Sequence, residues 1–248
     1  MREEPSVESS RPLGFDLVDG LAAYAKLALP LLSQAVMEGR LKQFVVEASV
    51  PTISYPNYAT IISGLDPKDH ELIDNDHRRR LTSDHFFKRL HRDGMTSAVV
   101  GFHWWEDLLG GDLPPSKLYE GEDTPDHWVF EQAEVIATGL HPDFLLVHPM
   151  GVDWAGHVYG GQSSEYLAAA TRIDREIHDF WKWWQLRMKG LLVIGADHGM
   201  GPGHHHDVNS LREQQVLYFV DSDGHPNVDL RRQSQVQNLL SMLMGEGV

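Results

Sequence analysis

LLVIGADHGMGPGHHH, residues 191–206, joins a short apolar run to an Asp-His pair, a series of glycines and three consecutive histidines. A short apolar run that ends at turn-forming residues is typical of a buried strand. Carboxylate and imidazole groups suit zinc and similar divalent ions, and glycines let the backbone turn tightly around an ion. The stretch therefore predicts metal ligands, including Asp197 and His198, at the end of a buried strand.

Similar apolar runs recur along the chain and alternate with longer stretches that have helical spacing. This alternation predicts an α/β fold with a mostly parallel central sheet. The expected strands are 13–18, 43–48, 97–101, 143–148, 191–195 and 216–220, and the expected helices are 21–38, 84–92, 127–138, 164–184 and 230–244.

The length and composition of the chain are those of one large globular domain. With 248 residues and 42% apolar content it can bury a full core, and neither a repeat nor a linker divides it. We expect residues 1–12 to be a flexible segment and residues 13–248 to form a single domain. The stretch 104–126, rich in glycine, proline and acidic residues, is expected to be a surface loop.

Charge and residue usage exclude several classes of function. The formal net charge of −15 argues against a nucleic-acid-binding surface. Without cysteine, any metal must be held by His, Asp or Glu. No apolar run reaches the roughly 18 residues of a membrane span, and residues 1–12 do not resemble a signal peptide. We expect a cytoplasmic protein; a periplasmic or secreted location stays open if a leader has been removed. The oligomeric state stays open as well.

Polar side chains directly follow three of the expected strands. In sheets of this kind, ligands bind beyond the carboxyl ends of the strands. A single Asp in such a place is more often a helix cap, so each residue alone has a structural alternative. Five ligand-type residues at one edge favour a shared site instead. They are Asp19, Asp153, His157, Asp197 and His198.

The segment VPTISYPNYATIISGL, residues 50–65, follows the second expected strand and carries Ser54 just ahead of Pro56. Proline is favoured in the first helical turn, so residues 57–63 are expected to continue as a short helix. Ser54 then lies at a helix N-terminus, where free N–H groups favour an anion such as phosphate. A serine cap on a structural helix is the alternative. A metal ion near the hydroxyl would make Ser54 a nucleophile.

Four segments in order resemble the alkaline phosphatase superfamily, and most closely its nucleotide pyrophosphatase/phosphodiesterase branch. They are VDGL (18–21), PTISYPNYATIISGLDPKDH (51–70), GVDWAGH (151–157) and ADHGM (196–200). The resemblance extends from Asp19 to about Val220. It implies a three-layer α/β sandwich with helices on both faces of a mostly parallel sheet.

The resemblance also implies two divalent metal ions, with zinc as the expected metal. The implied ligands are Asp19, Ser54, Asp197 and His198 at the first site, and Asp153, His157 and His206 at the second. His206 is selected from the final three histidines because it aligns with the family pattern without a gap, and His204 is the runner-up. Asn57 matches a family residue that holds phosphoryl oxygens through its amide.

The implied function is hydrolysis of a small phosphoester, in the manner of a phosphodiesterase or nucleotide pyrophosphatase. Ser54 would attack phosphorus in line, a phosphoserine would form, and a metal-activated water would release it. Ser54 departs from the Thr that this branch usually has, which leaves the substrate preference open. Larger relatives carry cap segments, whereas this chain has room only for a minimal cap at about 102–126.

Other activities fit the same site. The GVDxxGH pattern also resembles ethanolamine-phosphate transferases, in which an alcohol replaces water as the acceptor. A phosphomonoesterase or a phosphonate hydrolase is a further alternative. A noncatalytic, metal-stabilised binding domain is the alternative from another class, and it predicts a missing nucleophile or an incomplete set of ligands. A sulfatase is disfavoured because SYPNY (54–58) lacks the Arg of that branch.

Overall fold

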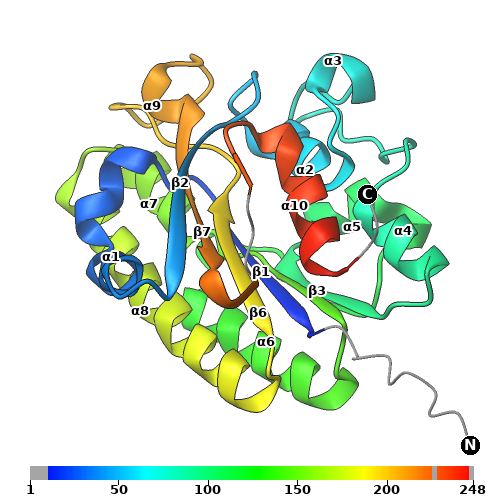
Figure 1. Cartoon of the computed structure of the whole chain (residues 1–248). Helices are drawn as coiled ribbons and strands as arrows, with labels where there is room; N and C mark the ends of the chain where they lie inside the picture. Colours follow the sequence, from blue (N-terminus) through cyan, green and yellow to red (C-terminus); the bar gives the residue numbers. More distant parts are fainter. Residues whose placement is uncertain (1–10, 225–227, 246–248) are drawn as a thin grey trace, which may run out of the picture.

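The computed structural model describes residues 11–224 and 228–245 (Figure 1). Most of the expected flexible segment, residues 1–10, lies outside the described part. Its last two residues are anchored, because the carbonyl of Pro12 accepts a hydrogen bond from Leu191 N at 2.9 Å and Arg11 Nε donates to the carbonyl of Lys189. Residues 11 and 12 therefore contact the domain that was expected to begin at residue 13.

A seven-stranded sheet forms the centre of the molecule, in the order β2-β7-β6-β1-β5-β3-β4. Within the described residues, β7 is antiparallel to both of its neighbours, and the other neighbouring pairs are parallel. The strands are β1 (Leu13–Val18), β2 (Leu41–Glu47), β3 (Ser97–Phe102), β4 (Ser116–Tyr119), β5 (Phe144–Val147), β6 (Leu191–Ala196) and β7 (Gln215–Asp221). The predicted mostly parallel sheet is confirmed.

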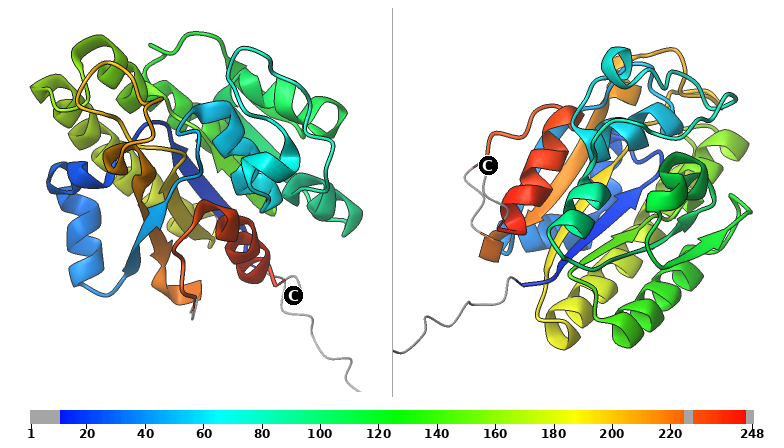
Figure 2. Two further views of the ribbon diagram at one scale, coloured as in Figure 1. Left: turned by 90° about the horizontal axis from the view of Figure 1, so that it is seen from above. Right: turned by 90° about the vertical axis from the view of Figure 1, so that its right-hand side faces the viewer.

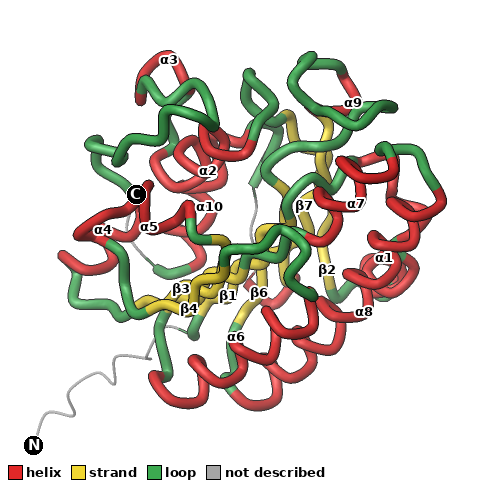
Figure 3. The backbone as a smooth tube through the Cα atoms, turned by 180° about the vertical axis from the view of Figure 1, so that it is seen from behind, coloured by secondary structure: helices red, strands yellow, loops and turns green. Residues whose placement is uncertain are grey.

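Helices cover both faces of this sheet, which makes three layers (Figures 1 and 2). One layer contains α1 (Pro30–Met37), α6 (Asp126–Leu140), α7 (Gly151–Tyr159) and α8 (Ser164–Arg187). The other contains α2 (Ser54–Ser63), α4 (Phe86–Arg92), α5 (Trp104–Leu109) and α10 (Val236–Leu243). The view from behind shows the strands between these two groups (Figure 3). Short helices α3 (Pro67–His70) and α9 (Leu211–Gln214) complete the order.

The longest helix, α8, shows how the sequence pattern produces this packing. Its buried side chains recur every three or four residues, so that they form one apolar stripe toward the sheet. Trp181 and Trp184 are both fully buried in that stripe, and their indole N–H groups donate to Asp221 Oδ2 and the carbonyl of Leu191. Within the described residues, no helix is both long enough and apolar enough to span a bilayer.

The segment 104–126 differs from the expected surface loop. It contains α5, a short 3-10 helix (Gly110–Asp112) and β4, which pairs in parallel with β3 at the edge of the sheet. Only Tyr119 of β4 is buried, because the strand is four residues long and lies at an edge. Such a strand carries no apolar run, which is why the sequence pattern did not reveal it.

Candidate metal centre

Three parallel strands deliver ligand-type side chains to one edge of the sheet. In the pairing of β1 with β6, Val18 lies opposite Ala196, so Asp19 and Asp197 leave the sheet side by side. β5, on the other side of β1, leads into α7, which carries Asp153. All three carboxylates are buried, at 0%, 0% and 3% exposure respectively. The predicted convergence at the carboxyl ends of the strands is therefore present in the structure.

A glycine allows the carboxylates to approach so closely. Gly20 has a φ of 69°, in the left-handed region, and a Cβ atom there would lie 2.6 Å from Asp153 Oδ1. A larger residue would meet both the strain of this backbone conformation and the side chain of Asp153. The DG pair in VDGL is thus required by the geometry between β1 and α7.

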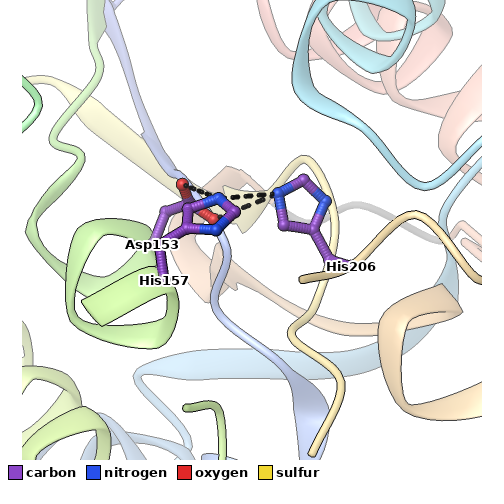
Figure 4. A group of neighbouring side chains, drawn as sticks. All are labelled: Asp153, His157 and His206. Atoms are coloured by element: carbon purple, nitrogen blue, oxygen red, sulfur yellow. Dashed lines mark hydrogen bonds and ion pairs between the residues drawn. The ribbon is translucent and has the colours of Figure 1, made fainter. Parts of the chain in front are cut away.

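Asp153, His157 and His206 form one compact cluster (Figure 4). Asp153 and His157 are one turn apart on α7, and Asp153 Oδ2 lies 3.2 Å from His157 Nε2. His206 Nε2 approaches from the loop after β6, 3.5 Å from Asp153 Oδ1 and 3.1 Å from His157 Nε2. The polar atoms of three side chains from two separate segments therefore point at one position.

A second cluster comprises Asp19, Asp153 and His198, whose candidate ligand atoms lie within 4.8 Å of one another. His198 Nε2 is 3.4 Å from Asp19 Oδ1 and 3.3 Å from Asp197 Oδ2. Ser54, the first residue of α2, places its Oγ 3.0 Å from His198 Nε2 and 3.5 Å from Asp19 Oδ1. Asp153 belongs to both clusters, so the two groups are contiguous.

The three imidazole rings are held in the same manner. Nδ1 of each ring donates to a backbone carbonyl: His157 to His204 O at 2.7 Å, His198 to Gly199 O at 3.0 Å and His206 to Thr52 O at 2.6 Å. A neutral ring that carries its proton on Nδ1 has a lone pair on Nε2. In metal-binding histidines, the nitrogen that does not bind the metal usually donates such a hydrogen bond. All three Nε2 atoms face the clusters.

The electrostatics of these clusters fit bound cations. Burial, together with the charges of Asp19 and Asp153, raises the pKa of Asp197 well above its ordinary value. Asp197 Oδ2 and Asp153 Oδ1 have no hydrogen-bond partner within the described residues. Buried carboxylates this close together are costly unless a positive charge lies between them. Carboxylate and imidazole donors match the preferences of zinc and related divalent ions.

The pKa of Asp19 is lowered and the pKa of His157 is raised. Burial would raise the pKa of Asp19, but the hydrogen bond from His148 and the nearby histidine charges outweigh it and hold the pKa well below the usual range. Without a metal ion, His157 Nε2 donates to Asp153, and this hydrogen bond raises the pKa of His157 to about 9, although burial opposes that shift. A metal ion bound at Nε2 would displace that proton. Both shifts follow from carboxylate-imidazole contacts.

The three consecutive histidines, residues 204–206, lie in different environments. His206 is 4% exposed and faces the cluster, whereas His204 and His205 are exposed. His204 points Nδ1 at the carbonyl of His157, 2.8 Å away. His206 is therefore the histidine that the structure brings to the candidate centre.

Asn57 was expected to hold phosphoryl oxygens through its amide, but in the structure that amide is bound to the backbone. Its Nδ2 group donates to the carbonyls of Pro51 and Ile53, at 3.1 and 2.9 Å. Both amide hydrogens are thus engaged by the backbone, and neither is left for a phosphoryl oxygen. Asn57 instead fixes the turn that leads into α2.

Asn75, which the sequence did not single out, brings another side-chain amide close to Ser54. Its Oδ1 accepts a hydrogen bond from Tyr55 N at 3.0 Å, which brings the side-chain amide to the N-terminus of α2, next to Ser54. Tyr58 and His148 were missed as well, and both contact Asp19. Tyr58 lies one helical turn after Ser54 and His148 directly follows β5, but neither residue type by itself indicates a hydrogen bond to Asp19, and Asn75 belongs to no spacing pattern.

Comparisons with known proteins agree with this geometry. A family model described as type I phosphodiesterase / nucleotide pyrophosphatase matches residues 16–118 and 116–239. The catalytic subunit of human GPI ethanolamine phosphate transferase 2 is 25% identical over 226 residues, which cover 84% of this chain and 22% of that protein. Mouse ectonucleotide pyrophosphatase/phosphodiesterase family member 1 is 28% identical over 184 residues, which cover 62% of this chain and 20% of that protein.

Solved structures share the fold. Murine ectonucleotide pyrophosphatase / phosphodiesterase 5 has a TM-score of 0.73 at 14% identity, with 95% of each chain covered. Phosphonoacetate hydrolase from Sinorhizobium meliloti 1021 has a TM-score of 0.59 at 18% identity, covering 77% of this chain and 57% of that one. The chain spans about a fifth of the length of the curated relatives named above. The family model covers most of the chain, and the chain therefore belongs to the type I phosphodiesterase / nucleotide pyrophosphatase family.

Proposed function

We propose that this chain is a metal-dependent phosphoester hydrolase of the phosphodiesterase type, with Ser54 as its nucleophile. The observation that carries the proposal is the position of Ser54 Oγ, 3.0 Å from His198 Nε2 at the N-terminus of α2 and beside a group of buried carboxylates. A purely structural helix cap would not need these charges around it. The serine therefore lies in an environment that suits a nucleophile.

The donor set supports two divalent ions, and we propose zinc as the metal. The first ion would be held by Asp19, Ser54, Asp197 and His198, and the second by Asp153, His157 and His206. When bound, such ions favour the alkoxide form of a serine and stabilise negative charge on phosphoryl oxygens. Each ligand is already oriented by the contacts described above.

The residues of this chain have distinct parts in the proposed reaction. Ser54 Oγ attacks phosphorus, the bond from phosphorus to the leaving oxygen breaks, and a phosphoserine forms. Asp19 Oδ1 and His198 Nε2 lie 3.5 and 3.0 Å from Oγ and would share its metal ion, so the serine proton would pass to solvent water. The Nδ2 group of Asn75 would bind a non-bridging oxygen, since its Oδ1 already accepts from Tyr55 N at 3.0 Å. Water then cleaves the phosphoserine and restores Ser54.

Turnover of chromogenic substrates tests this proposal directly. We expect hydrolysis of bis-p-nitrophenyl phosphate, p-nitrophenyl phosphate or p-nitrophenyl phenylphosphonate, loss of the activity on chelation, and recovery with zinc. Ser54→Ala should lower kcat by about 10³-fold or more, because it removes the attacking atom. Ser63→Ala is the matched control: Ser63 lies at the other end of α2, and its hydroxyl donates to Ala59 O.

The results separate the alternatives for this site. Turnover that survives chelation or Ser54→Ala would contradict the mechanism, and the relative rates on the three substrates would identify the preferred bond. Zinc binding without turnover of any phosphoester would favour the noncatalytic binding domain.

A phosphotransferase is the second candidate. It is favoured by the human GPI ethanolamine phosphate transferase 2 subunit, whose aligned region covers 84% of this chain. The phosphoserine would be the same, and an alcohol would attack it in place of water. Adding primary alcohols during turnover and following the products by ³¹P NMR distinguishes the two outcomes, since transfer gives a new phosphodiester or phosphomonoester of the alcohol.

A further inference from the structure

Asp19 is held through one oxygen and presents the other to the centre. Its Oδ1 lies near Ser54 Oγ and His198 Nε2, at 3.5 and 3.4 Å. Its Oδ2 accepts a short hydrogen bond from the hydroxyl of Tyr58 and lies 3.2 Å from His148 Nε2. All of these side chains are buried, at 3% exposure or less. The two oxygens of one carboxylate thus have separate sets of partners.

His148 is fixed in place from several directions. Its backbone N–H donates to Val100 O at 2.8 Å, and its carbonyl accepts a hydrogen bond from Tyr119. Its ring meets the rings of Tyr58 and Trp105 edge to face, with centroids 4.8 and 5.8 Å away. The ring therefore cannot turn without disrupting a packed aromatic cluster.

The hydrogen-bonding pattern also defines which nitrogen of His148 carries a proton. Nδ1 is buried and has no partner within the described residues, whereas Nε2 faces the carboxylate of Asp19. A lone pair on Nε2 would repel that carboxylate, so Nε2 carries the proton and donates it. His148 consequently acts on Asp19 as a donor and has no lone pair to offer a metal ion at that atom.

Tyr58 links this arrangement to the nucleophile. It lies four residues after Ser54 on α2, so both side chains emerge from the same face of the helix. Its ring stacks on Trp105 at a centroid distance of 4.9 Å, which fixes the direction of the hydroxyl. Movement of α2 would therefore move the nucleophile and a donor to Asp19 together.

We propose that Tyr58 and His148 form a two-donor clamp on Asp19 Oδ2, which positions Oδ1 for the first metal ion beside Ser54. This inference rests on the proposed function, in which Asp19 binds that ion. Tyr58 and His148 are positioning residues: they hold a ligand, and their polar side-chain contacts in this centre are to Asp19. Outer partners of this kind commonly change metal affinity by about 10–100-fold when they are removed.

Zinc titration of the metal-free protein against a chromophoric chelator tests the clamp without reference to turnover. We expect Tyr58→Phe and His148→Leu each to weaken one of the two zinc ions by about 10–100-fold and to leave the other unchanged. His148→Gln should bind both ions as the wild type does, because its Nε2 amide can replace the donor. Tyr55→Phe is the matched control, since that hydroxyl on the same helix donates to Arg79 O.

The outcomes separate this inference from the function on which it rests. Unchanged affinities for both zinc ions in Tyr58→Phe and in His148→Leu would overturn the clamp and leave the metal centre intact. Equal weakening of both ions would overturn it too, because the clamp contacts only Asp19. A wild-type protein that binds no zinc would overturn the metal centre and the clamp together. If His148→Leu does not fold, as judged by circular dichroism, Tyr58→Phe decides alone.

Discussion

At the scale of single residues, the candidate centre depends on which atom of each side chain is free. His157, His198 and His206 use Nδ1 for the backbone and keep Nε2 for the centre. His204 uses its Nδ1 on the carbonyl of His157 and stays exposed. Neighbouring histidines of the same triplet therefore have different chemical roles.

This difference predicts unequal effects of two substitutions. His206→Ala removes an Nε2 that lies 3.5 Å from Asp153 Oδ1, so we expect the second zinc to be lost on dialysis and activity to fall with it. His204→Ala should retain the zinc, because its backbone carbonyl still accepts from His157 Nδ1. Zinc content per chain, measured by atomic emission after dialysis, checks both. Equal zinc loss in the two variants would mean that the ligand is wrongly assigned.

Residue types and spacing indicated the acidic and imidazole side chains that the structure brings close together. The pattern of Asp and His after strands predicted that residues far apart in sequence, such as Asp19 and Asp197, lie close together. It could not indicate Asn75, whose contact depends on how a loop folds back, and it did not identify His148, directly after β5, as a partner of Asp19. It also could not show that the amide of Asn57 is used by the backbone.

At the scale of secondary-structure elements, one carboxylate connects the helices that flank β5. Asp126 is the first residue of α6, and its Oδ1 accepts a hydrogen bond at 3.0 Å from Gly151 N, which begins α7. Since α7 carries Asp153 and His157, this contact helps to fix the cluster of Asp153, His157 and His206. Burial raises the pKa of Asp126 to about 6, against the opposing effect of that hydrogen bond.

The raised pKa predicts a pH-dependent effect of Asp126→Asn on stability. Below about pH 4 the carboxyl is protonated in both folded and unfolded chains, so the variant and the wild type should be equally stable. Between pH 4 and 6 the unfolded chain loses this proton first, and the wild type therefore loses stability as the pH rises. At pH 8 the variant should have a free energy of unfolding about 1–3 kcal/mol higher, because its neutral amide oxygen can still accept from Gly151 N. Urea denaturation with a chelator at pH 4 and pH 8 measures this, and an equal difference at both pH values would contradict it.

Elements were predictable where burial gives a strong pattern. β1 and β6 are buried along their whole length, and their apolar runs located them within one residue. β4 was missed because an edge strand of four residues has no such run. Short helices such as α9 depend on local caps, here Ser210 and Glu213, more than on hydrophobic periodicity.

At the scale of the whole molecule, contacts between loops join the two halves of the centre. Thr52, just before α2, donates from its backbone to Asn209 Oδ1 at 2.9 Å and from its hydroxyl to Glu213 Oε2 at 3.0 Å. Its carbonyl also accepts from His206 Nδ1. The loop that carries His206 is therefore fixed against the loop that leads to Ser54. One fold holds the nucleophile and both clusters in a fixed relation.

The same fold concentrates buried negative charge, which predicts that the metal ions contribute to global stability. Without a cation, Asp19, Asp153 and Asp197 repel each other in a buried environment. Ions that bind only the folded state add about 4 kcal/mol when present at 1,000 times their dissociation constant. Chelation should therefore lower the melting temperature, and zinc should restore it.

The variant Asp197→Asn distinguishes the destabilising effect of this buried charge without metal from its stabilising effect as a zinc ligand. The raised pKa of Asp197 means that the metal-free wild type loses stability as the pH rises above the ordinary carboxyl range, whereas a neutral amide does not. With a chelator at pH 8, Asp197→Asn should be more stable than the wild type, and the difference should shrink toward pH 4. With zinc the order of stabilities should reverse, because the variant has lost a ligand.

Asp16→Asn is the matched control. Asp16 is also fully buried with a raised pKa and no hydrogen-bond partner within the described residues, but it lies inside β1. That variant should be more stable than the wild type in both conditions, measured by calorimetry. If Asp197→Asn also stayed more stable in zinc, Asp197 would not be a ligand.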